Sequence, residues 1–155
     1  MDCENSKYGK IAEENFLKGY NCTQAVFLAF SDLHGIDEKT AARLSSSFGG
    51  GMGRLREVCG TVSGMFLTAG ILYGYEEPED FQGKKEHYER VQKLAKAFEA
   101  ENGSIVCREL LGLNQKREEP VPEQRTEGYY KKRPCAKLVG MAAAIMEEYI
   151  QEHPL

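Results

Sequence analysis

The sequence predicts an all-α fold, a single-domain bundle of about six or seven helices. Three observations support this prediction. Apolar side chains recur three, four and seven residues apart along most of the chain, as they do on one face of an α-helix. Alternating strand patterns and runs of β-branched residues are nearly absent. The chain has 155 residues, 41% of them hydrophobic, which is the length of one domain with a core of its own.

The first third of the chain contains three helix patterns. Residues 6–18 carry apolar side chains at helical spacing. Asn21 has a glutamine three residues later, as in a capping box, and begins a second helix over residues 22–33. Asp37 caps a third helix that continues to Phe48. We therefore expect three consecutive helices joined by short turns.

A glycine-rich segment at residues 49–53 is the strongest break in the chain, and a buried helix follows it. Residues 57–72 are apolar almost all round, which predicts a helix at the centre of the bundle. Small residues on one face of this helix would let another helix come close. These small residues are Gly60, Ser63, Gly64 and Thr68.

The second half of the chain predicts three more helices and one long loop. Residues 80–103 form an amphipathic pattern, and residues 104–112 form a short helix capped by Ser104. Residues 114–128 are charged and contain two prolines, which predicts a mobile loop or lid. Pro134 lies in the first turn of a final helix. The inner stripe of that helix is Leu138, Ala142, Ile145 and Tyr149.

The charge balance argues against several classes of protein. Twenty Lys and Arg against 24 Asp and Glu give a net charge of −4, which argues against a nucleic-acid-binding surface. The uncharged stretch over residues 60–75 is shorter than the roughly 20 apolar residues of a membrane span. Residues 1–5 are polar and carry no basic or apolar leader. We expect these residues to be flexible and the protein to be cytoplasmic.

No common nucleotide or haem motif is present. The glycine-rich segment at residues 49–53 lacks the Gly-Lys-Ser/Thr ending of a phosphate-binding loop. Arg54 and Arg56 stand where the dinucleotide-binding pattern would need its last glycine. The three histidines are isolated in the sequence, so we expect them to lie on the surface.

Cysteine is the most informative residue type in the chain. In a reducing compartment, spaced cysteines are metal ligands or redox groups more often than structural disulfides. Of the five cysteines, four lie at or near predicted helix N-termini: Cys22, Cys59, Cys107 and Cys135. The free N–H groups and partial positive charge of a helix N-terminus favour a thiolate over a thiol.

Basic residues gather next to these cysteines although the chain is acidic overall. Arg54 and Arg56 precede Cys59, and a basic stretch at residues 131–133 precedes Cys135. This environment suits reactive thiolates or an anionic metal–thiolate centre. The alternative is that each cysteine is a small buried hydrophobic residue without a chemical role.

On these residues the chain resembles the C_GCAxxG_C_C family of redox-active proteins, named for four spaced cysteines and a Cys-Gly-Ala-x-x-Gly motif. The resemblance spans about residues 10–150. The matching segments are NCTQAV at 21–26, FGGGMG at 48–53, CGTVSG at 59–64, CRELLG at 107–112 and PC at 134–135. Thr61 replaces the alanine of the motif and would put a hydroxyl near the sulfurs. Cys3 has no place in the pattern and is expected to be a free thiol. The resemblance implies redox activity without a specific substrate.

Two kinds of chemistry fit four spaced cysteines. They can form dithiol/disulfide couples that exchange electrons with a partner protein or a small thiol through a mixed disulfide. They can instead hold one metal centre, either an iron–sulfur cluster or a structural zinc. No Cys-x-x-Cys pair is present, so ligands from four separate segments would have to converge. A third hypothesis is a non-catalytic binding module that forms a homodimer through the face of Gly60 and Gly64.

The expected site therefore contains the four family cysteines, as catalytic thiols or as metal ligands. The residues expected to hold a bound cofactor are Arg54, Arg56, Gly60 and Gly64. Cys59 lies between the glycine turn and the buried helix, close in sequence to two arginines, and is predicted to be the most activated sulfur.

Overall fold

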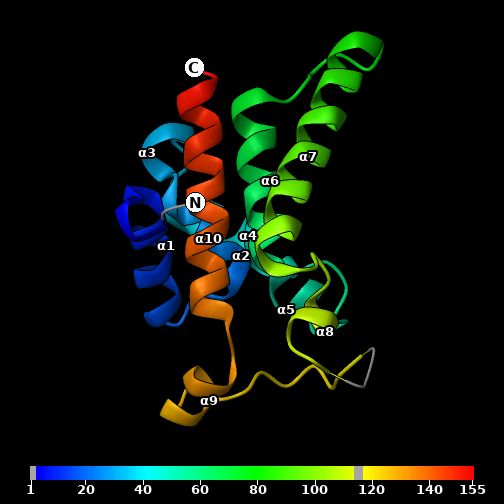
Figure 1. Ribbon diagram of the computed structural model, residues 1–155. Helices are drawn as coiled ribbons and strands as arrows, with labels where there is room; N and C mark the ends of the chain where they lie inside the picture. Colours follow the sequence, from blue (N-terminus) through cyan, green and yellow to red (C-terminus); the bar gives the residue numbers. More distant parts are fainter. Residues whose placement is uncertain (1–2, 114–116) are drawn as a thin grey trace.

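Helices make up all the regular structure in the part of the chain that the structure describes (Figure 1). The computed structural model describes residues 3–113 and 117–155, except for the side chain of Cys3. In chain order the helices are α1 (Lys7–Leu17), α2 (Cys22–Ala29), α3 (Ser31–His34), α4 (Glu38–Ser45), α5 (Gly49–Met52), α6 (Gly60–Tyr73), α7 (Phe81–Asn102), α8 (Cys107–Leu110), α9 (Glu127–Lys132) and α10 (Cys135–Glu152). Two 3-10 turns, η1 (Cys3–Asn5) and η2 (Ser46–Phe48), complete the described structure. The all-α prediction is confirmed.

Side-chain caps begin several helices where the sequence predicts them. The Asn21 side chain accepts a hydrogen bond from the Gln24 N–H, and the Gln24 side chain accepts one from the Asn21 N–H, so the capping box is complete. The carboxylates of Asp37 and Asp80 accept hydrogen bonds from N–H groups in the first turns of α4 and α7. Each such cap stabilises its helix by about 1 kcal/mol, because it satisfies an N–H group that has no partner within the helix.

The predicted helix over residues 22–33 is divided into α2 and α3 at Phe30. The Phe30 backbone leaves the helical region, with φ −98° and ψ 19°. The Ser31 hydroxyl donates to the Leu28 carbonyl oxygen and so competes for a group that a continuous helix would use.

The region after α7 also differs from the prediction. The prediction that Ser104 caps α8 is wrong, because its hydroxyl accepts from the Val106 N–H and the helix begins only after Val106. Thr126 caps α9, which lies at the end of the predicted loop. Residues 117–126 carry no helix, while residues 114–116 of that loop lie outside the described residues. Residues 3–5, expected to be flexible, form η1; residues 1–2 also lie outside the description.

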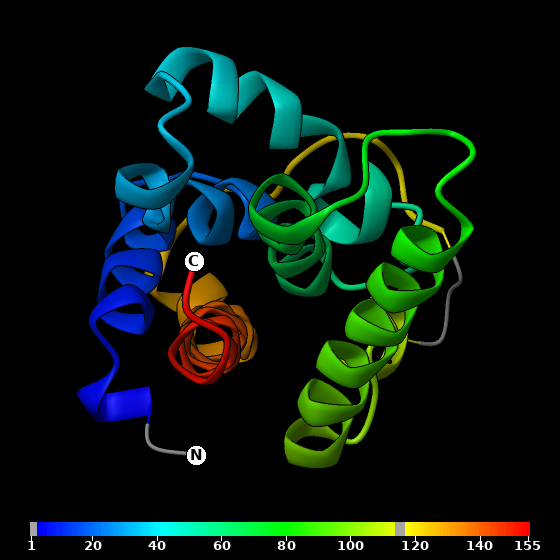
Figure 2. The ribbon, with the colours of Figure 1, turned by 90° about the horizontal axis from the view of Figure 1, so that it is seen from above.

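The core lies where α1, α2, α6 and α7 pack around α10. In Figure 1 α10 runs between α1 and α6, and Figure 2 shows α1 and α7 on opposite sides of the molecule. The largest fully buried side chains come from the whole length of the chain and include Phe16, Phe30, Met65, Leu94, Phe98 and Met146. The predicted inner stripe of α10 is buried. Within residues 3–113 and 117–155, none of the helices has the length and hydropathy of a membrane-spanning segment.

The predicted central helix is α6, which packs against α2, α7 and α10. Its small residues let α2 come into direct contact. A Cβ atom added at Gly64 would lie 2.8 Å from the Val26 Cβ and 2.9 Å from the Thr23 carbonyl oxygen. One added at Gly60 would lie 2.7 Å from Thr23 Oγ1. The face predicted to form a homodimer is therefore covered by α2 of the same chain, and the dimer hypothesis is wrong about this face.

Replacing Gly64 should destabilise the fold, because α2 would have to move away from α6. We expect Gly64→Leu to lower the free energy of unfolding by about 1–3 kcal/mol. Gly70, on the same helix, is the matched control, since a Cβ added there meets no atom within 4 Å. Gly70→Ala should raise stability by about 0.5–1 kcal/mol. Urea unfolding checks both variants, and an undiminished stability of Gly64→Leu would contradict the expected close contact.

Candidate functional site

The four family cysteines lie at helix N-termini, as predicted. Cys22, Cys107 and Cys135 are the first residues of α2, α8 and α10, and Cys59 is the N-cap of α6. All four line one cavity of about 360 Å³. The fold therefore brings together sulfurs from four distant segments of the chain.

A short backbone bridge holds the segments of Cys59 and Cys107 side by side. Val58 and Val106 form an isolated antiparallel bridge. The Cys59 N–H donates to the Ile105 carbonyl oxygen at 2.7 Å, and the Cys107 N–H donates to the Glu57 carbonyl oxygen at 2.6 Å. The sequence shows no alternation of apolar and polar residues at these positions, so this contact could not be predicted from local patterns.

The glycine-rich segment lets the backbone pass close to Cys107. Gly51 has a positive φ of 68°, and a Cβ atom added to it would lie 2.7 Å from the Cys107 Cβ. A side chain at this position would meet both a strained backbone and a steric clash. The glycine run is thus required by the packing around a cysteine.

Cys22 and Cys135 shift each other's pKa in opposite directions. A hydrogen bond between the two thiols is the largest cause: it raises the pKa of the Cys22 thiol well above the ordinary range and lowers the pKa of the Cys135 thiol. The positive charge of Arg133 also lowers the pKa of Cys135, and that of Arg125 acts in the same direction on Cys22. The interaction therefore favours the thiolate on Cys135 over a thiolate on Cys22.

The prediction that Cys59 is the most activated sulfur is wrong. Burial of Cys59 raises its pKa to about 12, and the neighbouring Cys22 sulfur adds to the rise. The Thr61 hydroxyl lies 3.1 Å from the Cys59 Sγ and opposes this shift. Thr61 is thus close to a sulfur, as the departure from the family motif suggested. The two arginines that precede Cys59 in sequence point elsewhere.

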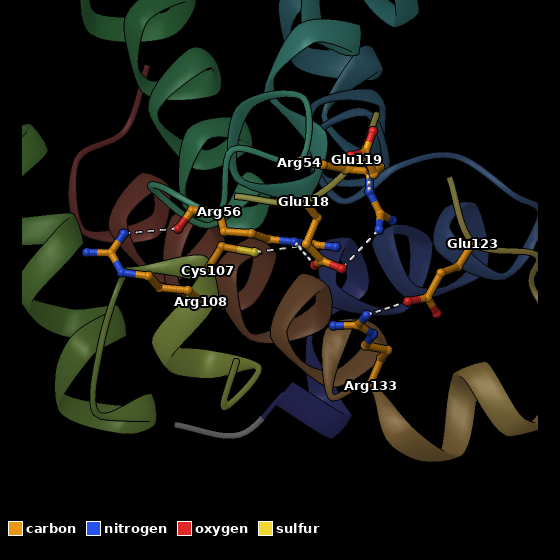
Figure 3. Close-up of polar contacts among 8 residues, drawn as sticks. All are labelled: Arg54, Arg56, Cys107, Arg108, Glu118, Glu119, Glu123 and Arg133. Carbon is orange, nitrogen blue, oxygen red and sulfur yellow. Dashed lines mark hydrogen bonds and ion pairs between the residues drawn. The ribbon is translucent and has the colours of Figure 1, made fainter. Parts of the chain in front are cut away.

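Arg56 contacts Cys107 rather than Cys59. Its Nη1 lies 3.5 Å from the Cys107 Sγ, and its Nε lies 2.6 Å from Glu118 Oε1 (Figure 3). Burial raises the pKa of Cys107, while the hydrogen bond from Arg56 opposes that rise. Arg56 is buried although it carries a full charge, so its two partners are what make its burial possible.

Residues 117–126, which we call the strap, supply part of the cavity wall. Glu118 of the strap forms ion pairs with Arg54 and Arg56 (Figure 3). Glu123 of the strap forms an ion pair with Arg133, with 2.6 Å between Oε1 and Nη2. Arg125, also from the strap, donates to the carbonyl oxygens of α1 and of the turn after it. The strap is therefore fixed to the rest of the site by charged hydrogen bonds.

Residues 20–149 match the family described as "Putative redox-active protein (C_GCAxxG_C_C)". The chain belongs to this family. The matched range contains every cysteine of the cavity, so the family pattern and the structure select the same four sulfurs. No curated protein and no solved structure matches the chain.

The other residues expected in the site of this family member are divided between the cavity and the core. Arg54, Arg56 and Gly60 line the cavity, whereas Gly64 lies deeper on α6 against α2. Sequence analysis missed Tyr129, which lines the cavity and whose pKa is raised to about 12, mainly by burial. Tyr129 lies in α9, a short helix that the sequence did not predict, so no sequence pattern identified this residue.

The four sulfurs do not form a ready-made metal site. Among the described residues, no three His, Cys, Asp or Glu side chains are arranged to hold one metal ion. A single zinc ion would need the family cysteines to move relative to one another. Cys3, excluded from the site by the family pattern, has its side chain outside the described residues.

Removing the Cys22 thiol should make Cys135 less acidic. Because the hydrogen bond from Cys22 is the main cause of the lowered pKa, Cys22→Ala should raise the pKa of Cys135 and reduce its thiolate fraction at neutral pH. Cys22→Ser is the matched control, since its hydroxyl can still donate. Ultraviolet absorbance of the thiolate against pH checks the shift, and Cys135→Ser identifies the signal. An unchanged titration in Cys22→Ala would show that Cys22 does not lower the pKa of Cys135.

Proposed function

We propose that this redox-active family member acts by thiol–disulfide exchange, with Cys22 and Cys135 as the reacting couple. The observation that carries the proposal is that both sulfurs line one cavity and interact there in the sense that favours a thiolate on Cys135 and a thiol on Cys22. A thiolate and a thiol in contact are the reduced form of a disulfide couple. A reducing compartment such as the cytoplasm, the location expected from the sequence, would keep the pair in this dithiol form.

The exposure of the two cysteines supports an order for the reaction. Cys22 is half-buried and Cys135 is buried, so an external reagent reaches Cys22 first. The lower pKa of Cys135 makes it the better leaving group when the disulfide is opened. Cys22 is thus the sulfur that forms the mixed disulfide.

The reductive direction needs two equivalents of an external thiolate, RS⁻. The first attacks the Cys22 Sγ of the disulfide, an S–S bond forms between R and Cys22, and Cys135 leaves as a thiolate with the bonding electron pair. The second attacks the sulfur of R, which releases RSSR, and Cys22 takes a proton. Two external thiolates are oxidised and one protein disulfide is reduced, and the reverse sequence oxidises the dithiol.

A metal centre held by all four cysteines is the competing proposal. The four helix N-termini around one cavity favour it, because their N–H groups and partial charges stabilise an anionic cluster. The interaction between Cys22 and Cys135 favours the dithiol instead, because it stabilises one thiolate beside one thiol.

Thiol counts and metal content of protein purified without oxygen distinguish the two proposals. The dithiol proposal predicts that mild oxidation removes one pair of thiols, which peptide mapping assigns to Cys22 and Cys135. Cys22→Ser should abolish exchange with a small disulfide, and Cys135→Ser should stop the reaction at the mixed disulfide on Cys22. Cys59→Ser should reduce exchange far less, because Cys59 is buried and does not belong to the reacting couple.

The metal proposal predicts a different pattern. All four cysteine-to-serine variants should then lose bound metal, visible absorbance and stability together. A stoichiometric metal with no accessible thiol pair would overturn the dithiol proposal.

A further inference from the structure

Arg54 and Arg56 share a single carboxylate beside the cysteine cavity. The Arg54 Nη2 lies 3.1 Å from Glu118 Oε2, and the Arg56 Nε lies 2.6 Å from Glu118 Oε1 (Figure 3). Arg54 also donates through Nε to the Glu119 carbonyl oxygen at 2.7 Å. Two guanidinium groups thus converge on one carboxylate, which is the usual arrangement for binding an anion.

The backbone that presents these arginines is strained. Met52, Arg54 and Arg56 all have positive φ values, of 70°, 68° and 58°. This conformation is unfavourable for residues with a Cβ atom, and it concentrates at ligand-binding and catalytic sites. Helix packing alone does not require two charged residues with positive φ. A binding site that must point both arginine side chains at one ligand gives a reason for this conformation.

The lining of the cavity carries an excess of positive charge. Its charged residues are four arginines and one glutamate, in a chain whose net charge is −4. The glutamate, Glu123, is already paired with Arg133. An anionic ligand would therefore be attracted into this cavity although the protein as a whole would repel it.

We propose that Arg54 and Arg56 bind a carboxylate of a small disulfide substrate, and that Glu118 of the strap occupies this place until the substrate displaces it. The proposal rests on the proposed thiol–disulfide function and names the chemical class of its substrate. The cavity of about 360 Å³ suits a small molecule rather than a folded partner.

The exchange of one carboxylate for another explains how the strap can open. Only 6% of the Arg56 side chain is exposed, so removing Glu118 alone would leave a buried charge without its anion. A substrate carboxylate replaces the lost hydrogen bonds, whereas a neutral disulfide does not. Arg56 also lies 3.5 Å from the Cys107 Sγ, so a carboxylate bound here is next to one sulfur of the cavity that Cys22 and Cys135 also line.

The bound substrate, RSSR with a carboxylate on R, then oxidises the dithiol. Cys22 passes its proton to the neighbouring Cys135 thiolate and attacks one substrate sulfur, so that RS⁻ leaves with the electron pair of the substrate disulfide. Cys135 then gives this proton to solvent and attacks the Cys22 sulfur of the mixed disulfide, and the second RS⁻ leaves. The substrate is reduced to two thiolates and the protein gains one disulfide.

Two disulfides that differ in charge test the proposal: dithiodipropionate, which carries two carboxylates, and the neutral hydroxyethyl disulfide. The measurement is the rate of thiol loss in the full-length reduced protein. Glu118→Gln removes the internal competitor and should raise the rate with dithiodipropionate roughly tenfold, since hydrogen bonds to charged groups contribute at least that much. The rate with hydroxyethyl disulfide should change much less. Arg54→Gln should lower the ratio of the two rates.

Glu119→Gln is the matched control, because it makes the same charge change on an exposed neighbouring residue of the strap. If it accelerates dithiodipropionate as much as Glu118→Gln does, the effect is one of general charge and the proposal is wrong. Equal acceleration of both disulfides by Glu118→Gln would make the strap a simple lid and would also overturn the proposal.

A binding experiment separates this proposal from the proposed function. Suberate resembles dithiodipropionate but has no sulfur, so its calorimetric binding does not depend on thiol chemistry. It should bind Glu118→Gln roughly tenfold more tightly than the unaltered protein, for the same reason. If neither disulfide oxidises the thiols but suberate binds in this way, the exchange function fails and the carboxylate site stands. If suberate binds neither protein, the carboxylate site is overturned.

Discussion

The close contact between α2 and α6 determines where the cysteines meet. Gly60 and Gly64 allow this contact because any side chain there would meet α2. Cys22 begins α2 and Cys59 caps α6, so packing these two helices brings the first two sulfurs to the same cavity. The bridge between Val58 and Val106 then adds Cys107, and the start of α10 adds the fourth. The chemistry of the site thus depends on two glycines that carry no chemistry themselves.

Shared placement at helix N-termini does not give the four thiols the same acidity. A helix N-terminus stabilises a nearby anion by about 0.3–1 kcal/mol. One pKa unit corresponds to about 1.4 kcal/mol. The rise of the Cys59 pKa to about 12, caused chiefly by burial, is therefore beyond what a helix N-terminus can offset. The pKa of Cys135 is lowered chiefly by a hydrogen bond from Cys22, so a specific partner sets the direction of this shift.

The sequence predicts what depends on neighbouring residues and misses what depends on distant ones. The caps at Asn21 and Asp37, the central helix and the four cysteines at helix N-termini all follow from local patterns, and the structure agrees with them. Which sulfurs pair could not be predicted, because Cys22 and Cys135 come from opposite ends of the chain. Arg56 shows the same limit. It lies three residues from Cys59, but its positive φ and the neighbouring bridge direct it to Cys107.

Arg56 links the charge of the sulfurs to the position of the strap. Its guanidinium donates to the Cys107 sulfur and to the Glu118 carboxylate, so both groups draw on one positive charge. A group that binds two partners couples them. The effect of the first partner on the binding free energy of the second equals the effect of the second on the binding free energy of the first. The position of the strap and the charge of the Cys107 thiol therefore depend on each other. Any change in what faces Arg56 from the strap must alter the electrostatics of Cys107, and any change in the charge of Cys107 must alter how firmly the strap is held.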